Sequence, residues 1–222
     1  MVLSTESVGG IDEAGRGAIL GPLVVAGVSA NSKALKRLAE LGVRDSKLLT
    51  HERRCALYEE ITSWCDAVSF LPILPEEIDR YVTYGRRRRK LNFLEAIHMA
   101  RIVPLLGVDQ VYIDAPDTNA RLFTTELKEM LRSRPCPRIV AEHKADRNYV
   151  VVSAASIVAK VERDRAVELL RVEHGEFGSG YPSDEETIAY LRRWMEREGA
   201  FPPFARRSWR TWDRILAATL VP

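Results

Sequence analysis

The sequence predicts an α/β protein, a sheet flanked by helices, with an all-helical segment after about residue 165. Extended apolar runs rich in β-branched residues alternate with segments whose apolar residues recur at helical spacing. Beyond residue 165 only the helical spacing continues. A chain of 222 residues fits one large domain, or one domain with a small appendage. We therefore expect a sheet-containing domain over residues 1–165 and a helical segment over residues 166–222.

The expected strands begin with a hairpin. The first strand ends in Gly10–Gly17 (GIDEAGRG), where two adjacent carboxylates precede a Gly-Arg-Gly turn, and Pro22–Val28 resumes the extended apolar pattern. Further strands are expected at Ala67–Ile73, Val108–Asp114 and Arg138–Glu142. Acidic residues at or just past several of these strands make the strand ends candidates for function.

Helices are expected between and after the strands. Ser32 is the predicted N-cap of the first, and Ser183 opens a capping-box pattern at the start of a helix that Gly199 ends. Small residues along Ser153–Val172 would allow that long helix to pack closely against a neighbour. The last helix carries an apolar stripe that we interpret as core: Trp209, Trp212 and Leu216. The other helices are indicated by Leu57, Ile61 and Trp64, by Pro75, by Leu91–Leu105, and by Phe123, Leu127, Met130 and Leu131.

Composition and charge limit the function classes. A hydrophobic content of 46% fits a soluble protein with a real core, and no apolar run approaches the about 20 residues that span a bilayer. The formal net charge is only +2, so any binding of nucleic acid would depend on local patches. Cys55, Cys65 and Cys136 form no C-x-x-C pair, and without a signal-like start they are expected to be reduced thiols in a cytoplasmic protein.

Asp12, Asp114 and Asp146 share a setting, because each lies at or just after a predicted strand end. Functional groups gather beyond strand ends in α/β sheets, so these acids could converge. Without metal they would repel one another, whereas two divalent cations about 4 Å apart would relieve the repulsion and equip the site for phosphodiester hydrolysis. Taken singly, Asp114 could instead cap a helix near Thr118, and Asp146 could be a plain turn residue.

Other chemistries find no support in the sequence. The histidines are scattered without zinc-ligand spacing, and no G-x-S-x-G elbow indicates a Ser-His-Asp hydrolase. Basic residues could contact a nucleic-acid backbone, although a charge run is also typical of a solvated loop. The basic candidates are the run Arg86–Lys90 and the arginines Arg192, Arg193, Arg206, Arg207 and Arg210.

A set of motifs, in order along the chain, resembles type 2 ribonuclease H, most closely its archaeal branch, from about Gly9 to Trp212. The resemblance implies a ribonuclease H-like fold: a mixed five-stranded sheet flanked by helices, with a helical C-terminal segment that completes the substrate-binding cleft. The motifs are Gly10–Gly17, Arg44–Lys47 (RDSK), Tyr112–Asp114 (YID), His143–Asp146 (HKAD) with Val152–Ser156 (VSAAS), and Gly178–Asp184 (GSGYPSD).

By this resemblance Asp12, Glu13, Asp114 and Asp146 form a four-acid catalytic site that binds two Mg²⁺ or Mn²⁺ ions. Asp12 is our choice for the ligand that both ions share. Glu13, next to it on an extended chain, should point the opposite way. It would then bind metal through its backbone carbonyl, or support the site without touching the ions.

The resemblance also implies the substrate contacts. Gly15, Arg16 and Gly17 would read the 2′-hydroxyl of a ribonucleotide through backbone groups, since the glycines lack Cβ bulk. Lys47 would hold a phosphate, and Tyr181 would stack on the sugar at the RNA-to-DNA junction. As alternatives, Lys47 could be a solvated loop charge and Tyr181 a packing aromatic.

The activity implied is an endoribonuclease that cuts the RNA strand of RNA/DNA hybrids and nicks duplex DNA at embedded ribonucleotides, leaving 3′-hydroxyl and 5′-phosphate ends. The rivals are a 3′-to-5′ exonuclease with a similar acidic site and a non-catalytic hybrid-binding protein. The sequence departs from the family at Ala18, where proline is usual. The stretch Ala217–Pro222 holds no glutamine-plus-aromatic box, so sliding-clamp binding is not expected, and we expect a monomer.

Overall fold

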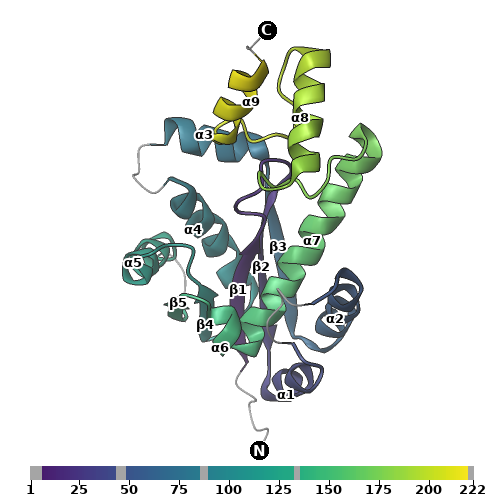
Figure 1. Cartoon of the computed structure of the whole chain (residues 1–222). Helices are drawn as coiled ribbons and strands as arrows, with labels where there is room; N and C mark the ends of the chain where they lie inside the picture. The colour runs from purple at the N-terminus through teal and green to yellow at the C-terminus, as the bar shows by residue number, and fades with distance from the viewer. Residues whose placement is uncertain (1–6, 44–48, 86–89, 133–135, 220–222) are drawn as a thin grey trace, which may run out of the picture. The chain divides into compact units, whose positions relative to one another are not determined.

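The computed structural model describes residues 7–43, 49–85, 90–132 and 136–219. Within them lies a mixed five-stranded sheet in the order β3-β2-β1-β4-β5 (Figure 1), which confirms the predicted fold class. Strand β1 pairs antiparallel with β2 and parallel with β4, and β4 pairs parallel with β5. The strands are β1 (Val8–Ala14), β2 (Leu23–Ala30), β3 (Ala67–Ile73), β4 (Gln110–Asp114) and β5 (Arg138–Glu142).

The helices fall close to the predicted places. None of them, in the described ranges, has the length and hydropathy needed to cross a bilayer. They are α1 (Ser32–Glu40), α2 (His51–Trp64), α3 (Pro75–Tyr84), α4 (Lys90–Ile102), the 3₁₀ turn Val103–Leu105, α5 (Ala120–Met130), α6 (Ala145–Asn148), α7 (Val150–His174), α8 (Glu185–Glu198) and α9 (Thr211–Thr219).

Two predicted helix caps were wrong by one residue. Asn31 rather than Ser32 caps α1, because its extended backbone lets the side-chain oxygen accept from the N–H groups of the first turn. Asp184 rather than Ser183 caps α8 for the same reason. In both cases neighbouring residues are good caps, and the backbone dihedrals decide between them.

The chain divides into two compact units. Unit 1 comprises Met1–Ala14, Val24–Leu71 and Leu91–Glu162, and unit 2 comprises Gly15–Leu23, Pro72–Lys90 and Arg163–Pro222. The last segment of unit 2 begins close to the boundary predicted at residue 165. Its role in completing a substrate-binding cleft stays a prediction.

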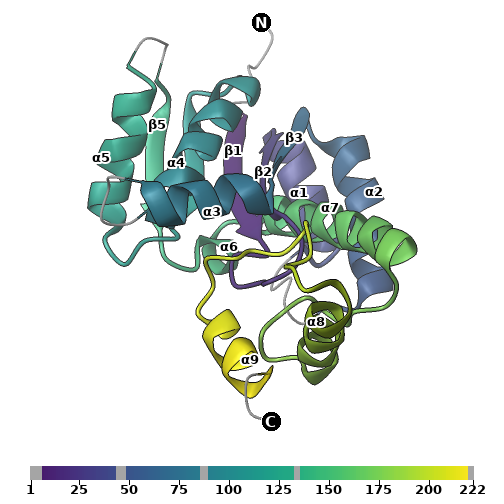
Figure 2. The ribbon, with the colours of Figure 1, turned by 90° about the horizontal axis from the view of Figure 1, so that it is seen from above.

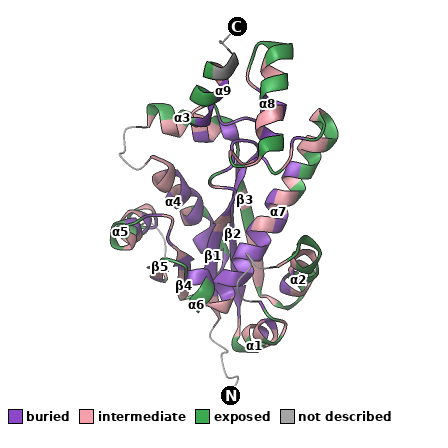
Figure 3. Cartoon of the chain, viewed as in Figure 1, coloured by how far each residue is buried: buried purple, intermediate pink, exposed green. Residues whose placement is uncertain are grey.

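The core of unit 1 lies between the sheet and the helices α1, α2 and α7. Buried residues, purple in Figure 3, run along β1, β2 and the first half of α7. The small residues expected to allow close packing of α7 are buried there, including Ala154, Ala155 and Ala159. On the opposite face Ile102 of α4 lies against Gly27 of β2.

The core of unit 2 is aromatic. The rings of Phe177, Tyr190 and Phe204 pack against one another, and those of Phe201 and Trp212 meet edge to face with 4.5 Å between their centroids. Trp212 is thus the core residue that the sequence predicts, whereas Trp209 precedes α9 and is half-buried. Unit 2 therefore has a hydrophobic core of its own, to which Ile19 and Leu20 of the β1–β2 connection also belong.

Each edge strand of the sheet has a feature that would hinder the pairing of a further strand, and the feature differs between the two edges. Edge strand β3 carries Pro72, which has no N–H to offer a further strand. Edge strand β5 is only 5 residues long, and it begins with Arg138 and ends with Glu142.

Candidate active site

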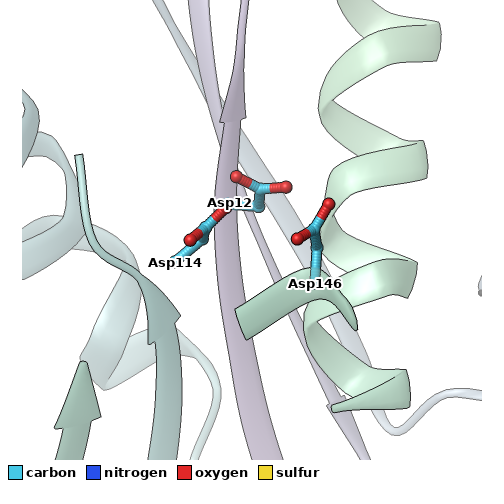
Figure 4. A group of neighbouring side chains, drawn as sticks. All are labelled: Asp12, Asp114 and Asp146. Atoms are coloured by element: carbon cyan, nitrogen blue, oxygen red, sulfur yellow. The ribbon is translucent and has the colours of Figure 1, made fainter. Parts of the chain in front are cut away.

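The register of the sheet brings the first pair of acids together. Ile11 of β1 is aligned with Ile113 of the parallel strand β4, so the residues that follow them, Asp12 and Asp114, stand side by side. Parallel neighbours in register point their side chains to the same face. Figure 4 shows the side chains of Asp12 and Asp114 gathered with that of Asp146, with Asp12 between the other two.

The third acid comes from a short helix after β5. Lys144 adopts a left-handed conformation (φ 58°), the one non-glycine residue with positive φ in the described ranges, and α6 begins directly after it. The Ala145 N–H donates to Asp114 Oδ1 at 3.2 Å, which ties α6 to the end of β4. As a result Asp12, Asp114 and Asp146 each offer an oxygen within 4.8 Å of the others.

A close approach of α7 to β1 shapes the same face. A Cβ built on Gly10 would lie 2.4 Å from the carbonyl carbon and oxygen of Val151 and 2.6 Å from the Val152 nitrogen. Only glycine lets the first turn of α7 pack this closely on the strand. Because Gly10 and Asp12 are two residues apart on β1, they share the face that α7 covers.

Helix α7 supplies polar partners for Asp12. The Ser156 hydroxyl hydrogen-bonds to the Asp12 carboxylate, and Lys160, one turn further along, donates to Ser156 Oγ at 2.7 Å. The Glu13 N–H donates to Asp12 Oδ1 at 2.7 Å. Burial raises the pKa of Asp12 from 3.8 to about 7, helped by the nearby Asp114 carboxylate, while these donors and the Lys160 charge act in the opposite direction.

The donor set fits a hard divalent cation. Asp12 and Asp146 are 5% and 2% exposed, so their carboxylates gather in a largely desolvated place. Oxygen-only ligands suit Mg²⁺ or Mn²⁺ rather than zinc. A cation would also offset the burial that raises the Asp12 pKa, and we therefore judge these residues able to hold the metal.

Two further predictions concern Glu13, the fourth acid, and the alternative that Asp114 caps a helix near Thr118. Glu13 is not among the described acids that meet within 4.8 Å, so its predicted part in the site stays a prediction. Helix α5 is capped by Asn119, whose side chain accepts from the Leu122 N–H. Asp114 therefore does not cap that helix.

Gly15, Arg16, Gly17 and Tyr181 belong to unit 2. A Cβ on Gly17 would lie 3.9 Å from Tyr181 Cε1, so the Tyr181 ring lies beside the turn. The guanidinium of Arg163, which is 6% exposed, lies 4.7 Å from the centre of that ring. Gly15 has φ +86°, and its Cβ would lie 2.5 Å from Arg163 Cδ, so this position requires glycine.

Ala18, where the resemblance led us to expect proline, closes this turn. The Ala18 N–H donates to the Gly15 carbonyl at 3.2 Å and closes the turn. Proline could not make this bond, because it has no N–H. Ala18 is fully buried.

The loop that carries Tyr181 is held by backbone bonds. Gly180 has φ +76°, and its carbonyl accepts from the N–H groups of Ile19 and Leu20. The Asp184 carboxylate accepts from the Ser179 N–H, and these backbone and side-chain bonds lower the Asp184 pKa to about 2. This loop is therefore fixed at both ends.

The candidate basic residues fall into three groups. Lys47 and Arg86–Arg89 lie outside the described residues. Arg192, Arg193, Arg207 and Arg210 are exposed, as a backbone contact would require. The prediction was wrong for Arg206, which is fully buried and donates hydrogen bonds to backbone carbonyls.

The sequence analysis missed the role of two α7 residues. Ser156 was expected to be a small packing residue and part of the motif Val152–Ser156, without a role of its own at the site, and Lys160 was not considered. Their spacing of four residues puts them on one face of the helix, next to the predicted acids, and this was the available signal.

Comparison with known proteins extends these observations. Residues 9–212 match the family model described as Ribonuclease HII. The ribonuclease HII of Cenarchaeum symbiosum (strain A) is 45% identical over 201 residues, which cover 90% of this chain and 94% of that protein. The crystal structure of ribonuclease H2 from Pyrococcus horikoshii OT3 is similar with a TM-score of 0.85 at 39% identity, over 96% of this chain and 98% of that chain. The RNase HII in the structure of the PCNA:RNase HII complex from Archaeoglobus fulgidus is similar with a TM-score of 0.82 at 41% identity, over 91% of this chain and 95% of that chain.

Proposed function

Because this chain belongs to the ribonuclease HII family of metal-dependent ribonucleases H, we propose that it cuts the RNA strand of RNA/DNA hybrids and nicks duplex DNA at embedded ribonucleotides. The observation that carries the proposal is the group of Asp12, Asp114 and Asp146, which each offer a carboxylate oxygen within 4.8 Å of the others and of which Asp12 and Asp146 are buried. The resemblance in the motif set supports the same activity. The products would have 3′-hydroxyl and 5′-phosphate ends.

Asp12, Asp114 and Asp146 would hold the divalent ions, and Glu13 would complete the set. Two bound ions, Mg²⁺ or Mn²⁺, would activate the attacking water and stabilise the leaving oxygen. Ser156 would keep the Asp12 carboxylate in one orientation. The Ala145 N–H would do the same for Asp114, at 3.2 Å from its Oδ1.

Substrate recognition would use unit 2. The turn Gly15–Gly17 has little side-chain bulk, so a ribose could approach its backbone, and the 2′-hydroxyl is what distinguishes RNA from DNA. Tyr181 would stack on the sugar at the junction, and Lys47 would hold a phosphate. The turn and the Tyr181 ring lie beside each other, which supports a shared role.

Further partners are a matter of proposal. The relative from Archaeoglobus fulgidus was solved in a complex with PCNA. For this chain the sequence predicts no clamp binding and a monomer, and both stay predictions. Gel filtration with and without a sliding clamp would test both.

The activity is tested with end-labelled duplexes and purified protein. A duplex with one embedded ribonucleotide and a long RNA/DNA hybrid should both be cut in Mg²⁺ or Mn²⁺, and excess chelator should abolish the cutting. An all-DNA duplex of the same sequence is the control. A ladder that shortens from the 3′ end would indicate an exonuclease, and binding of the hybrid without cutting would indicate a non-catalytic protein.

Tyr181→Ala should lower cleavage of the single-ribonucleotide duplex by about ten- to a hundredfold, because a stacked ring is worth roughly 1–3 kcal/mol. Tyr181→Phe keeps the ring and should lose less. Manganese affinity, measured by calorimetry on the free protein, should stay unchanged in both variants. If Tyr181→Ala cuts at the parent rate and melts at a lower temperature, Tyr181 is a packing residue.

A further inference from the structure

The turn Gly15–Gly17 is supported from inside by a buried arginine. Arg206, in the segment between α8 and α9, has no exposed surface. This segment lies alongside the β1–β2 connection (Figures 1 and 2), where Leu20 and Ala205 form a bridge and the Arg206 N–H donates to the Ile19 carbonyl at 2.8 Å.

The Arg206 guanidinium joins both ends of the connection. Nη1 donates to the Arg16 carbonyl at 2.9 Å, and Nε and Nη2 both donate to the Gly21 carbonyl at 3.2 Å. The guanidinium also lies 5.0 Å from the ring centre of Trp209. A planar fork with several donors can make this pair of contacts at once, which a lysine cannot.

The bond to the Arg16 carbonyl also decides where the next amide points. In a trans peptide the C=O of one residue and the N–H of the next point in opposite directions. With the Arg16 carbonyl held inward by Arg206, the Gly17 N–H faces outward. Gly17 is exposed, and no residue within the described ranges accepts a hydrogen bond from its N–H.

The four residues that follow Gly17 already donate hydrogen bonds. The N–H groups of Ala18, Ile19, Leu20 and Gly21 donate to backbone carbonyls. The Gly17 N–H is thus an open donor in a turn whose neighbours are fixed. Gly17 itself lies beside the Tyr181 ring, on which the substrate sugar would stack.

We infer that Arg206 is a positioning residue, which holds the Arg16 carbonyl inward and so presents the Gly17 N–H to the ribose 2′-hydroxyl oxygen. The identity of the ligand, a ribose 2′-hydroxyl, rests on the proposed function. The orientation of the Arg16–Gly17 peptide is independent of that function. Arg206 therefore acts on selectivity for ribonucleotides rather than through contact with the phosphate backbone.

The test compares Arg206→Lys with Arg197→Lys, the same change at an exposed arginine of unit 2. Arg206→Lys should lower kcat/KM on the single-ribonucleotide duplex by about tenfold or more, the effect of losing a hydrogen bond to a charged group. Manganese affinity of the free protein should not change. The Gly17 amide signal in the NMR spectrum of the free protein should shift in Arg206→Lys and stay in place in Arg197→Lys.

A folded Arg206→Lys protein with parental kcat/KM and an unmoved Gly17 signal would overturn the inference. If Arg206→Lys does not fold, amide hydrogen exchange is measured instead in Asp12→Asn, a variant that should bind the duplex without cutting it. Bound duplex should slow the exchange of the Gly17 amide. Equal exchange with and without the duplex would overturn the inference. If the parent protein cuts no duplex, the proposed function fails, while the Gly17 signal still decides whether Arg206 positions the peptide.

Discussion

Asp12→Asn is expected to lower the cleavage rate at least about a thousandfold while leaving the fold intact. Losing a carboxylate ligand removes several kcal/mol of transition-state stabilisation, and each 1.36 kcal/mol is a factor of about ten in rate. The measurement is single-turnover cleavage of the RNA/DNA hybrid at saturating Mg²⁺. The matched control is Asp109→Asn, an exposed acid of unit 1 that should cut like the parent.

The same variant should be more stable than the parent in metal-free buffer at pH 8. The folded-state pKa of Asp12 is raised from 3.8 to about 7, so protonated Asp12 stabilises the fold. That contribution is full below about pH 4 and is lost as the pH rises through about 7. Asparagine stays neutral and should escape this loss.

Thermal unfolding in EDTA at pH 5 and pH 8 measures the effect. At pH 8 we expect Asp12→Asn to melt at least about 3 °C above the parent, roughly 1 kcal/mol for a chain of this size. The gap should narrow at pH 5. Cleavage within tenfold of the parent would remove Asp12 from the metal centre, whereas a gap that is equal at both pH values would contradict only the raised pKa.

Gly10→Ala is expected to destabilise the protein by about 3 kcal/mol or more, because the new methyl group would overlap backbone atoms that cannot move by a rotamer change. Those atoms belong to Val151 and Val152, 2.4 and 2.6 Å from the built Cβ. Pushing α7 away from β1 would also displace Ser156 from Asp12. Urea unfolding and cleavage assays should therefore both show a loss.

Gly9→Ala is the matched control for Gly10→Ala. Its Cβ would meet only side-chain atoms, those of Leu106, Val108 and Val111 at 2.9–3.2 Å, which can shift. Its loss of stability should be clearly the smaller of the two. If both variants unfold at the same urea concentration, the close approach of α7 to β1 is not a constraint on this strand.

Much of the fold and the acidic group could be predicted from the sequence, because both follow from local patterns. The bounds of β3 and β5 agree with the apolar runs, and Asp114 ends a strand as expected. The sequence predicted that acids at strand ends could converge, but the pairing of β1 with β4, which sets Asp12 beside Asp114, is seen only in the structure. Periodicity alone did not define which strands are neighbours.

What the sequence could not predict depends on tertiary packing. Arg206 sits among exposed arginines in the sequence, and only its burial shows that it bonds backbone carbonyls instead of solvent. The sequence gives no sign that Gly10 differs from other strand glycines, and only the structure shows that the backbone of α7 lies too close to it for a side chain. The caps Asn31 and Asp184 were each missed by one residue, because backbone dihedrals are not visible in composition.

The guarded sheet edges bear on how the protein behaves at high concentration. An open edge strand is a template on which a second copy can add its own strand, the first step of aggregation. Pro72 in β3 interrupts the row of donors at one edge. At the other, β5 is short and ends in opposite charges, Arg138 and Glu142, so a copy that paired there would gain few bonds. The sheet that aligns the acids is thus also built to resist joining edge to edge with another copy of itself.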